Sequence, residues 1–190
     1  MDWRFGVPAD EEAELLAATL LRSGVDLAPF SDGQVAIGLN ALLFPNYGDT
    51  AGRIMAVDVP IERRIAAVAA IGRLYADCLA QRAPPVLGHL SEGAGHPLSF
   101  VTYMLWDVSP IDWWAAKDDR LFAAYLGVLE MGLASPNDAV VESALHGLGH
   151  LPGERRPAGT RLIDDWLAGA GSARLELRAY AERARSGCIQ

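Results

Sequence analysis

Three side chains of metal-binding type follow one another at four-residue intervals: Glu142, His146 and His150. Residues four apart lie on the same side of a helix. A carboxylate and two neutral imidazoles can supply three ligands to zinc or another divalent ion. The glutamate precedes the histidine pair, so it would act as a ligand and not as the base of an HExxH motif. His89 and His96 are candidates for a fourth ligand. The spacing is therefore compatible with a zinc-type site.

The same residues have two other interpretations. With Val141 as the origin of a helical wheel, they fall about 100° to 180° around the axis, on the flank and polar face. They would then form a solvated helix surface, with Glu142 paired to His146 and His150 favoured by the C-terminal end of the helix dipole. Alternatively, the imidazoles contact a protein partner. The apolar stripe of this predicted helix comprises Val141, Ala144, Leu145, Leu148 and Leu151.

An aromatic group forms the second candidate site. Trp106, Trp113 and Trp114 lie close together in sequence, with Tyr103 just before them. Aromatic side chains contribute strongly to protein interfaces, so these tryptophans are candidates for a partner-binding or self-association face. The alternative is that they pack inside the fold. Adjacent helical residues diverge by about 100°, so we expect Trp113 or Trp114 to lie at a seam or on the surface.

The composition indicates a globular chain and restricts its partners. Of the 190 residues, 51% are hydrophobic, and the net charge is −8. Such an acidic protein repels phosphate backbones and anionic lipids, which argues against nucleic-acid and membrane binding. A basic protein partner is compatible with this charge, although acidity also serves solubility alone. Two cysteines, Cys78 and Cys188, give no disulfide framework. With no signal peptide and no long apolar run, we expect a cytoplasmic protein. A single lysine, Lys117, against 15 arginines indicates a GC-rich bacterial genome.

Enzyme motifs are mostly missing. The sequence contains no G-x-S-x-G elbow and no phosphate-binding P-loop. Gly147 and Gly149 resemble part of a dinucleotide fingerprint, but they lie inside a predicted helix with no strand before it. The sequence therefore favours a binding protein over an enzyme.

Helical signals fill most of the chain, and no segment alternates with the period of a strand. We expect an all-α fold of about eight helices in a single domain, residues 1–190. A Gly- and Pro-rich connection at 83–97 is a possible subdivision point. Segments 98–108 and 111–116 are short and aromatic-rich, and 46–58 is expected to be a loop. The longer predicted helices span 10–23, 31–44, 60–82, 118–133, 138–151, 159–168 and 172–185.

Two of these helices share a sequence pattern. ALHGLGHL at 144–151 aligns without gaps on AVAAIGRL at 67–74. The offset of 77 residues is close to twice the roughly 40-residue period of two-helix repeats. Gly72 and Gly149 match, and each would let a neighbouring helix approach closely. His146 and His150 have no counterpart in the first copy, so the repeat does not require them.

These segments resemble HEAT-like helical repeats, best over 118–151 and fairly over 60–82. The resemblance implies antiparallel helix hairpins stacked as a short HEAT/armadillo-like array. It also implies a protein-binding scaffold, since such families share no catalytic residues. We therefore expect a protein–protein interaction module, with an inhibitor or immunity-type protein for a basic partner as one version. A homo-oligomer is also possible. The alternative is a metal-binding protein or metal-dependent enzyme using Glu142, His146 and His150.

Overall fold

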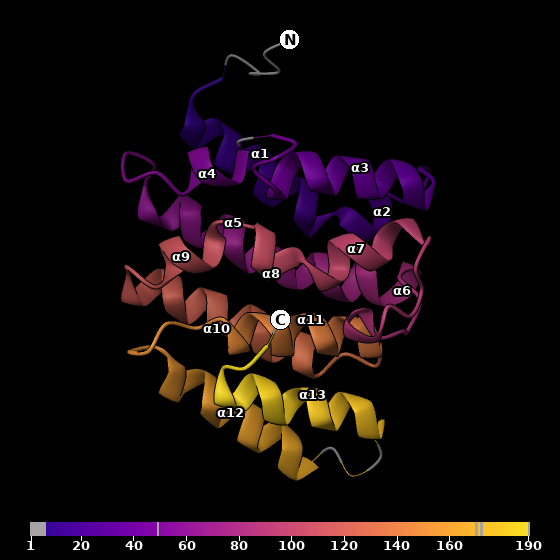
Figure 1. Ribbon diagram of the computed structural model, residues 1–190. Coiled ribbons are helices and arrows are strands. Elements are labelled where there is room, and N and C mark those ends of the chain that lie inside the picture. Colours follow the sequence, from indigo (N-terminus) through magenta and orange to yellow (C-terminus); the bar gives the residue numbers. More distant parts are fainter. Residues whose placement is uncertain (1–6, 49, 170, 172, 190) are drawn as a thin grey trace.

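The helices are stacked in the order of the chain in the computed structural model, which describes residues 7–48, 50–169, 171 and 173–189 (Figure 1). The N-terminal layer contains α1 (Ala9–Leu21), α2 (Ser23–Asp26), α3 (Asp32–Leu43) and α4 (Thr50–Ile54). Next comes α5 (Ile61–Leu74), which continues through a π turn (Tyr75–Leu79) into α6 (Ala80–Arg82). The short helices α7 (Pro97–Tyr103), α8 (Leu105–Val108) and α9 (Ile111–Ala115) run along the same part of the molecule (Figure 1).

Two helical hairpins complete the stack. They are α10 (Asp119–Leu133) with α11 (Asp138–Gly149), and α12 (Arg156–Gly169) with α13 (Leu175–Ser186). Among the described residues there is no strand, and eight helices have at least seven residues. The expected all-α class is thus confirmed. The loop expected at 46–58 contains α4, and the 83–97 connection contains one short 3-10 turn, Gly88–Leu90. In the described part of the chain, no helix has the length and apolar character needed to cross a bilayer.

Polar side chains cap the starts of α3, α10 and α11. Ser31 and Gln34 form a reciprocal capping box at α3, and the Asp118 carboxylate accepts from two backbone N–H groups at α10. Asn137 caps α11 by accepting from the N–H of Ala139. Its amide nitrogen donates to the carbonyl oxygens of Ala80 (3.2 Å) and Ala83 (2.8 Å). These caps satisfy backbone groups that a helix end leaves unpaired, and the Asn137 cap also joins α11 to the end of α6.

One cluster of buried apolar side chains extends from α1 to α13. α5 packs between α1 and α10, whereas α11 packs against α7, α8, α10, α12 and α13. Every residue of α11 from Ala139 to Gly149 is consequently buried. α11 is therefore the central helix of the C-terminal half.

The two matching glycines lie at close contacts, as their positions in the repeat pattern predicted. A Cβ on Gly149 would lie 3.1 Å from the Cα of Ala184, so α13 approaches α11 closely there. A Cβ on Gly72 would lie 2.7 Å from the sulfur of Met131 in α10. The first contact involves backbone, which cannot move aside as a methionine side chain can.

Candidate functional site

The polar residues of α11 lie inside the fold and not on a solvated surface. Glu142 and His146 are 0% and 1% exposed. The expectation that they line a polar face is therefore wrong. A helical wheel gives the direction of each side chain but not what packs there, and α7, α8 and α13 cover the side that the wheel assigned to solvent. Only His150, at the end of α11, is partly exposed.

Glu142 holds the 83–97 connection. Its carboxylate accepts from the backbone N–H groups of Gly88 (2.6 Å) and His89 (3.1 Å). The Nδ1–H of His89 also donates to it. This buried charge is thus paired and hydrogen-bonded, as a buried carboxylate must be. The expected pairing of Glu142 with His146 is replaced by this pairing with His89.

His146, His150 and Asp107 form a polar cluster at the end of α11, which we call the histidine cluster. The Nε2 atoms of the two histidines are 2.9 Å apart. The Nε2 of His150 is 3.3 Å from the Oδ1 of Asp107, which lies on α8. Ligand-type atoms of all three residues lie within 4.8 Å of one another. Nδ1 of His146 is hydrogen-bonded to the hydroxyl of Tyr180 on α13, at 2.6 Å.

The protein environment favours the neutral form of His146. Burial, together with the neighbouring His150, lowers its pKa to about 4, although Asp107 acts in the opposite direction. Burial also raises the pKa of Tyr180, so its hydroxyl stays protonated. At neutral pH the centre of the cluster therefore presents an uncharged imidazole, the form in which histidine binds metals.

The structure brings together two of the three predicted metal ligands. Glu142 is directed to the 83–97 connection, whereas Asp107 takes the position beside the histidines. Sequence reasoning missed Asp107 as a ligand because it is 39 residues before His146 and follows no ligand spacing. Of the possible fourth ligands, His89 is bound to Glu142. His96 caps α7 and lies 3.5 Å from Asp32, so it belongs to another part of the surface.

The three predicted contact tryptophans have different environments. Trp106 is 1% exposed and donates its indole N–H to Tyr75 at 2.6 Å, so it is a core residue and not part of a surface. Trp113 is exposed, and Lys117 lies over its ring, 2.9 Å from the centroid. Trp114 is partly buried against the core. One of the adjacent tryptophans thus lies on the surface, as their angular separation requires.

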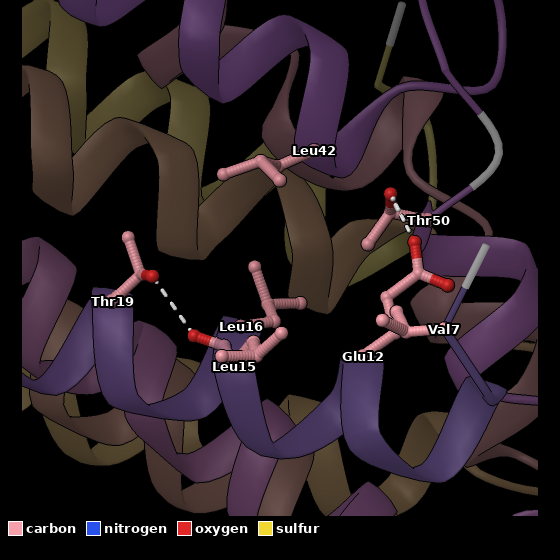
Figure 2. A pocket seen from close by; sticks show the side chains of 7 residues that line it. All are labelled: Val7, Glu12, Leu15, Leu16, Thr19, Leu42 and Thr50. Atoms are coloured by element: carbon pink, nitrogen blue, oxygen red, sulfur yellow. Dashed lines mark hydrogen bonds between the residues drawn. The ribbon is translucent and has the colours of Figure 1, made fainter. Parts of the chain in front are cut away.

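An apolar groove lies between α1 and α3. Its first part has a volume of about 300 Å³. In Figure 2, Leu15, Leu16 and Thr19 of α1 lie opposite Leu42 of α3. The hydroxyl of Thr19 donates to the carbonyl of Leu15, so it adds little polarity to the wall. At one end, the hydroxyl of Thr50 donates to Glu12 at 2.8 Å.

The groove continues toward the start of α3. The second part, about 240 Å³, shares Thr19 and Leu42 with the first and is bounded by Phe30, Gly38 and Leu39. No heavy atom lies within 4 Å of the position that a Cβ on Gly38 would occupy, so the space beside Gly38 is unoccupied. Exposed large apolar side chains gather in the same layer: Leu15, Leu21, Val25, Phe30, Ile37 and Tyr47. Sequence analysis missed this surface because it treated these residues only as members of helices.

The layer that carries the groove is acidic. Residues 7–48 contain six acidic residues and a single basic one, Arg22. Arg53 of α4, in the same layer, and Arg63 and Arg82 from neighbouring helices form ion pairs with some of these carboxylates. These three arginines offset part of the charge and leave the layer net negative.

Comparison of the chain with models of known families, with curated proteins and with solved structures found no match.

Proposed function

We propose that this chain is a protein-binding module of the helical-repeat type that receives an amphipathic, basic helix of a partner in the groove between α1 and α3. The observation that carries the proposal is the groove itself, an open apolar hollow in an acidic layer. Contiguous exposed apolar surface of this kind is typical of interaction sites.

The arrangement of helices supports the HEAT-like part of the proposal. Two hairpins, α10–α11 and α12–α13, follow one another along the stack (Figure 1). The two matching segments, 67–74 and 144–151, belong to α5 and to the end of α11, and both helices pack against α10. In helical repeats each unit buries its apolar face against its neighbours, and the stacked array offers an extended binding surface.

A helix is the occupant that fits the groove best. Walls formed by two helices and a floor of aliphatic side chains match the apolar stripe of an amphipathic helix, with anchors at i, i+3 or i+4 and i+7. The net negative charge of the layer favours lysine and arginine beside that stripe, because complementary charges speed association and select partners. An inhibitor or immunity-type protein that neutralises a basic target is one form of this function.

The proposal is tested with a designed peptide. A fluorescently labelled helix of about 18 residues, roughly five turns, carries a leucine stripe flanked by lysines. We expect micromolar binding by fluorescence anisotropy, weakened by salt because charges contribute. Gly38→Leu fills the groove and should weaken binding at least about tenfold, or ~1.4 kcal/mol. Since leucine is a better helix former than glycine, this variant should fold at least as stably.

Two controls make the outcome decisive. Leu175→Glu alters an exposed leucine of α13, at the other end of the stack, and should leave binding unchanged. A peptide with glutamates in place of lysines should bind more weakly. The proposal is overturned if the lysine peptide does not bind, if Gly38→Leu binds it as tightly as the natural chain, or if the two peptides bind equally. Binding of a fatty acid without binding of the peptide would assign the groove to a small apolar ligand.

A further inference from the structure

The histidine cluster is a second feature, and it is independent of the groove. We propose that Asp107, His146 and His150 bind a single divalent cation of the zinc class. The two imidazoles come from α11 and its end, and the carboxylate comes from α8. The site therefore joins two elements that are 39 residues apart in sequence, counted from Asp107 to His146.

Two of the three ligand–ligand distances are close to those of a coordination sphere. Zinc binds histidine nitrogen at about 2.0–2.1 Å and carboxylate oxygen at about 2.0–2.2 Å, so two ligands of a tetrahedral ion lie roughly 3.4 Å apart. The two Nε2 atoms are 2.9 Å apart, and the Nε2 of His150 is 3.3 Å from the Asp107 carboxylate. The third pair, His146 and Asp107, lies within the 4.8 Å that spans the whole cluster, so binding of the ion would draw these two side chains toward each other and move the imidazoles slightly apart.

The surroundings of His146 fit a metal ligand. When Nε2 binds an ion, Nδ1 carries the proton, and Nδ1 of His146 faces the hydroxyl oxygen of Tyr180 at 2.6 Å. Metal-binding histidines are typically held in this way by a hydrogen bond from the second ring nitrogen, which fixes the tautomer and the orientation. Tyr180 is itself hydrogen-bonded to Tyr103, whose ring meets the edge of His146.

The donor set indicates which ion binds. Two imidazoles with one carboxylate suit zinc, cobalt and nickel, whereas magnesium and calcium prefer oxygen ligands. The side chains of His150 and Asp107 are 31% and 38% exposed, so an ion reaches the cluster from solvent. With three protein ligands, a fourth position is left for water or for a ligand group.

The chain offers a matched control. His96 and Asp32 form another exposed histidine–aspartate pair, with an Nε2–Oδ2 distance of 3.5 Å and side-chain exposures of 32% and 36%. Among the described residues, this pair is not part of any group of three metal-type ligands. The His96–Asp32 pair is therefore as exposed as His150 and Asp107, but it has no second histidine corresponding to His146.

The test is calorimetric titration of the chelator-treated chain with Zn²⁺ alone, in a Cys188→Ser background that removes the exposed thiol. We expect one ion per chain, with micromolar or tighter affinity, and no heat from Mg²⁺. His150→Ala and Asp107→Asn should each weaken Zn²⁺ binding at least about tenfold. Even the loss of a residue that only hydrogen-bonds to a metal ligand typically lowers metal affinity about 10–100-fold. Both positions are partly exposed, so the fold tolerates the changes. His96→Ala should have no effect.

Co²⁺ gives a second readout, because a tetrahedral site produces strong visible absorption that a hexahydrated ion lacks. The proposal is overturned if Zn²⁺ gives no heat, or if binding survives His150→Ala or Asp107→Asn unchanged. Equal weakening by His96→Ala would show binding to scattered surface histidines and would overturn it as well. None of these outcomes depends on the groove, because the peptide test involves α1 and α3 only.

Discussion

Hydroxyl and indole groups at the centre of the fold are paired with one another. The hydroxyl of Tyr75 is 2.8 Å from that of Ser143 and accepts from the indole of Trp106 at 2.6 Å. All three residues are buried. This network joins the end of α5 to α8 and α11, so the tyrosine oxygen is a junction between three helices. It also explains why a tryptophan from an aromatic-rich segment belongs to the core.

Removal of that oxygen tests the network. Tyr75→Phe leaves the ring in place but strands a buried N–H and a buried hydroxyl, and an unpaired buried group costs about 1–3 kcal/mol. We therefore expect the free energy of unfolding in denaturant to fall by about that amount. Tyr47→Phe, at an exposed position, is the control and should change stability little. Equal stability of the two variants would mean that the hydrogen bonds of Tyr75 contribute nothing.

At the scale of elements, two buried or bidentate contacts hold the middle of the 83–97 connection. Glu142 of α11 accepts hydrogen bonds from the Gly88–His89 turn, and Arg174, just before α13, forms a bidentate ion pair with Glu92. This pairing with Arg174 lowers the pKa of Glu92 to about 2, with help from the N–H of Leu87. A long connection with only one short 3-10 turn is thereby fixed to α11 and to the residue before α13.

Loss of the Glu142 hydrogen bonds should reduce stability more than loss of the Glu92–Arg174 ion pair. Glu142→Ala leaves three part-buried N–H donors without their acceptor, and an unpaired buried polar group costs about 1–3 kcal/mol. We expect faster amide hydrogen exchange at Gly88 and His89 in this variant. Glu92→Ala removes a more exposed ion pair and should have a smaller effect on stability. If Glu142→Ala leaves exchange at Gly88 and His89 unchanged, the turn is held by other contacts.

Helices were more predictable from the sequence than their surroundings. Ser31 and Asn137 are of the residue types preferred at helix N-caps, and they cap α3 and α11. The burial of Glu142 was not predictable, because its partner lies more than 50 residues away in an irregular connection. Asp107 was missed for the same reason: its position beside His150 depends on how α8 packs on α11. Local rules therefore predict helices, whereas packing determines sites.

At the scale of the whole molecule, the two ends of the stack differ. The N-terminal layer exposes several large apolar side chains, of which Leu15 and Phe30 line the groove. The outer surfaces of α12 and α13 carry charged residues: Arg161, Asp164, Asp165, Glu176, Glu182, Arg183 and Arg185. The described ends of the stack therefore differ in surface character, and charged side chains predominate at the C-terminal end, although Leu175 is also exposed there.

Binding of a basic helix between α1 and α3 can be observed directly by NMR. The lysine-flanked peptide is titrated into the isotopically labelled chain, and backbone amide shifts are followed residue by residue. We expect the perturbed amides to concentrate in α1 and α3, around Leu15, Thr19 and Gly38, and α12 and α13 to be unaffected. Perturbations confined to α12 and α13, or spread evenly over the acidic surface, would contradict the proposed binding site.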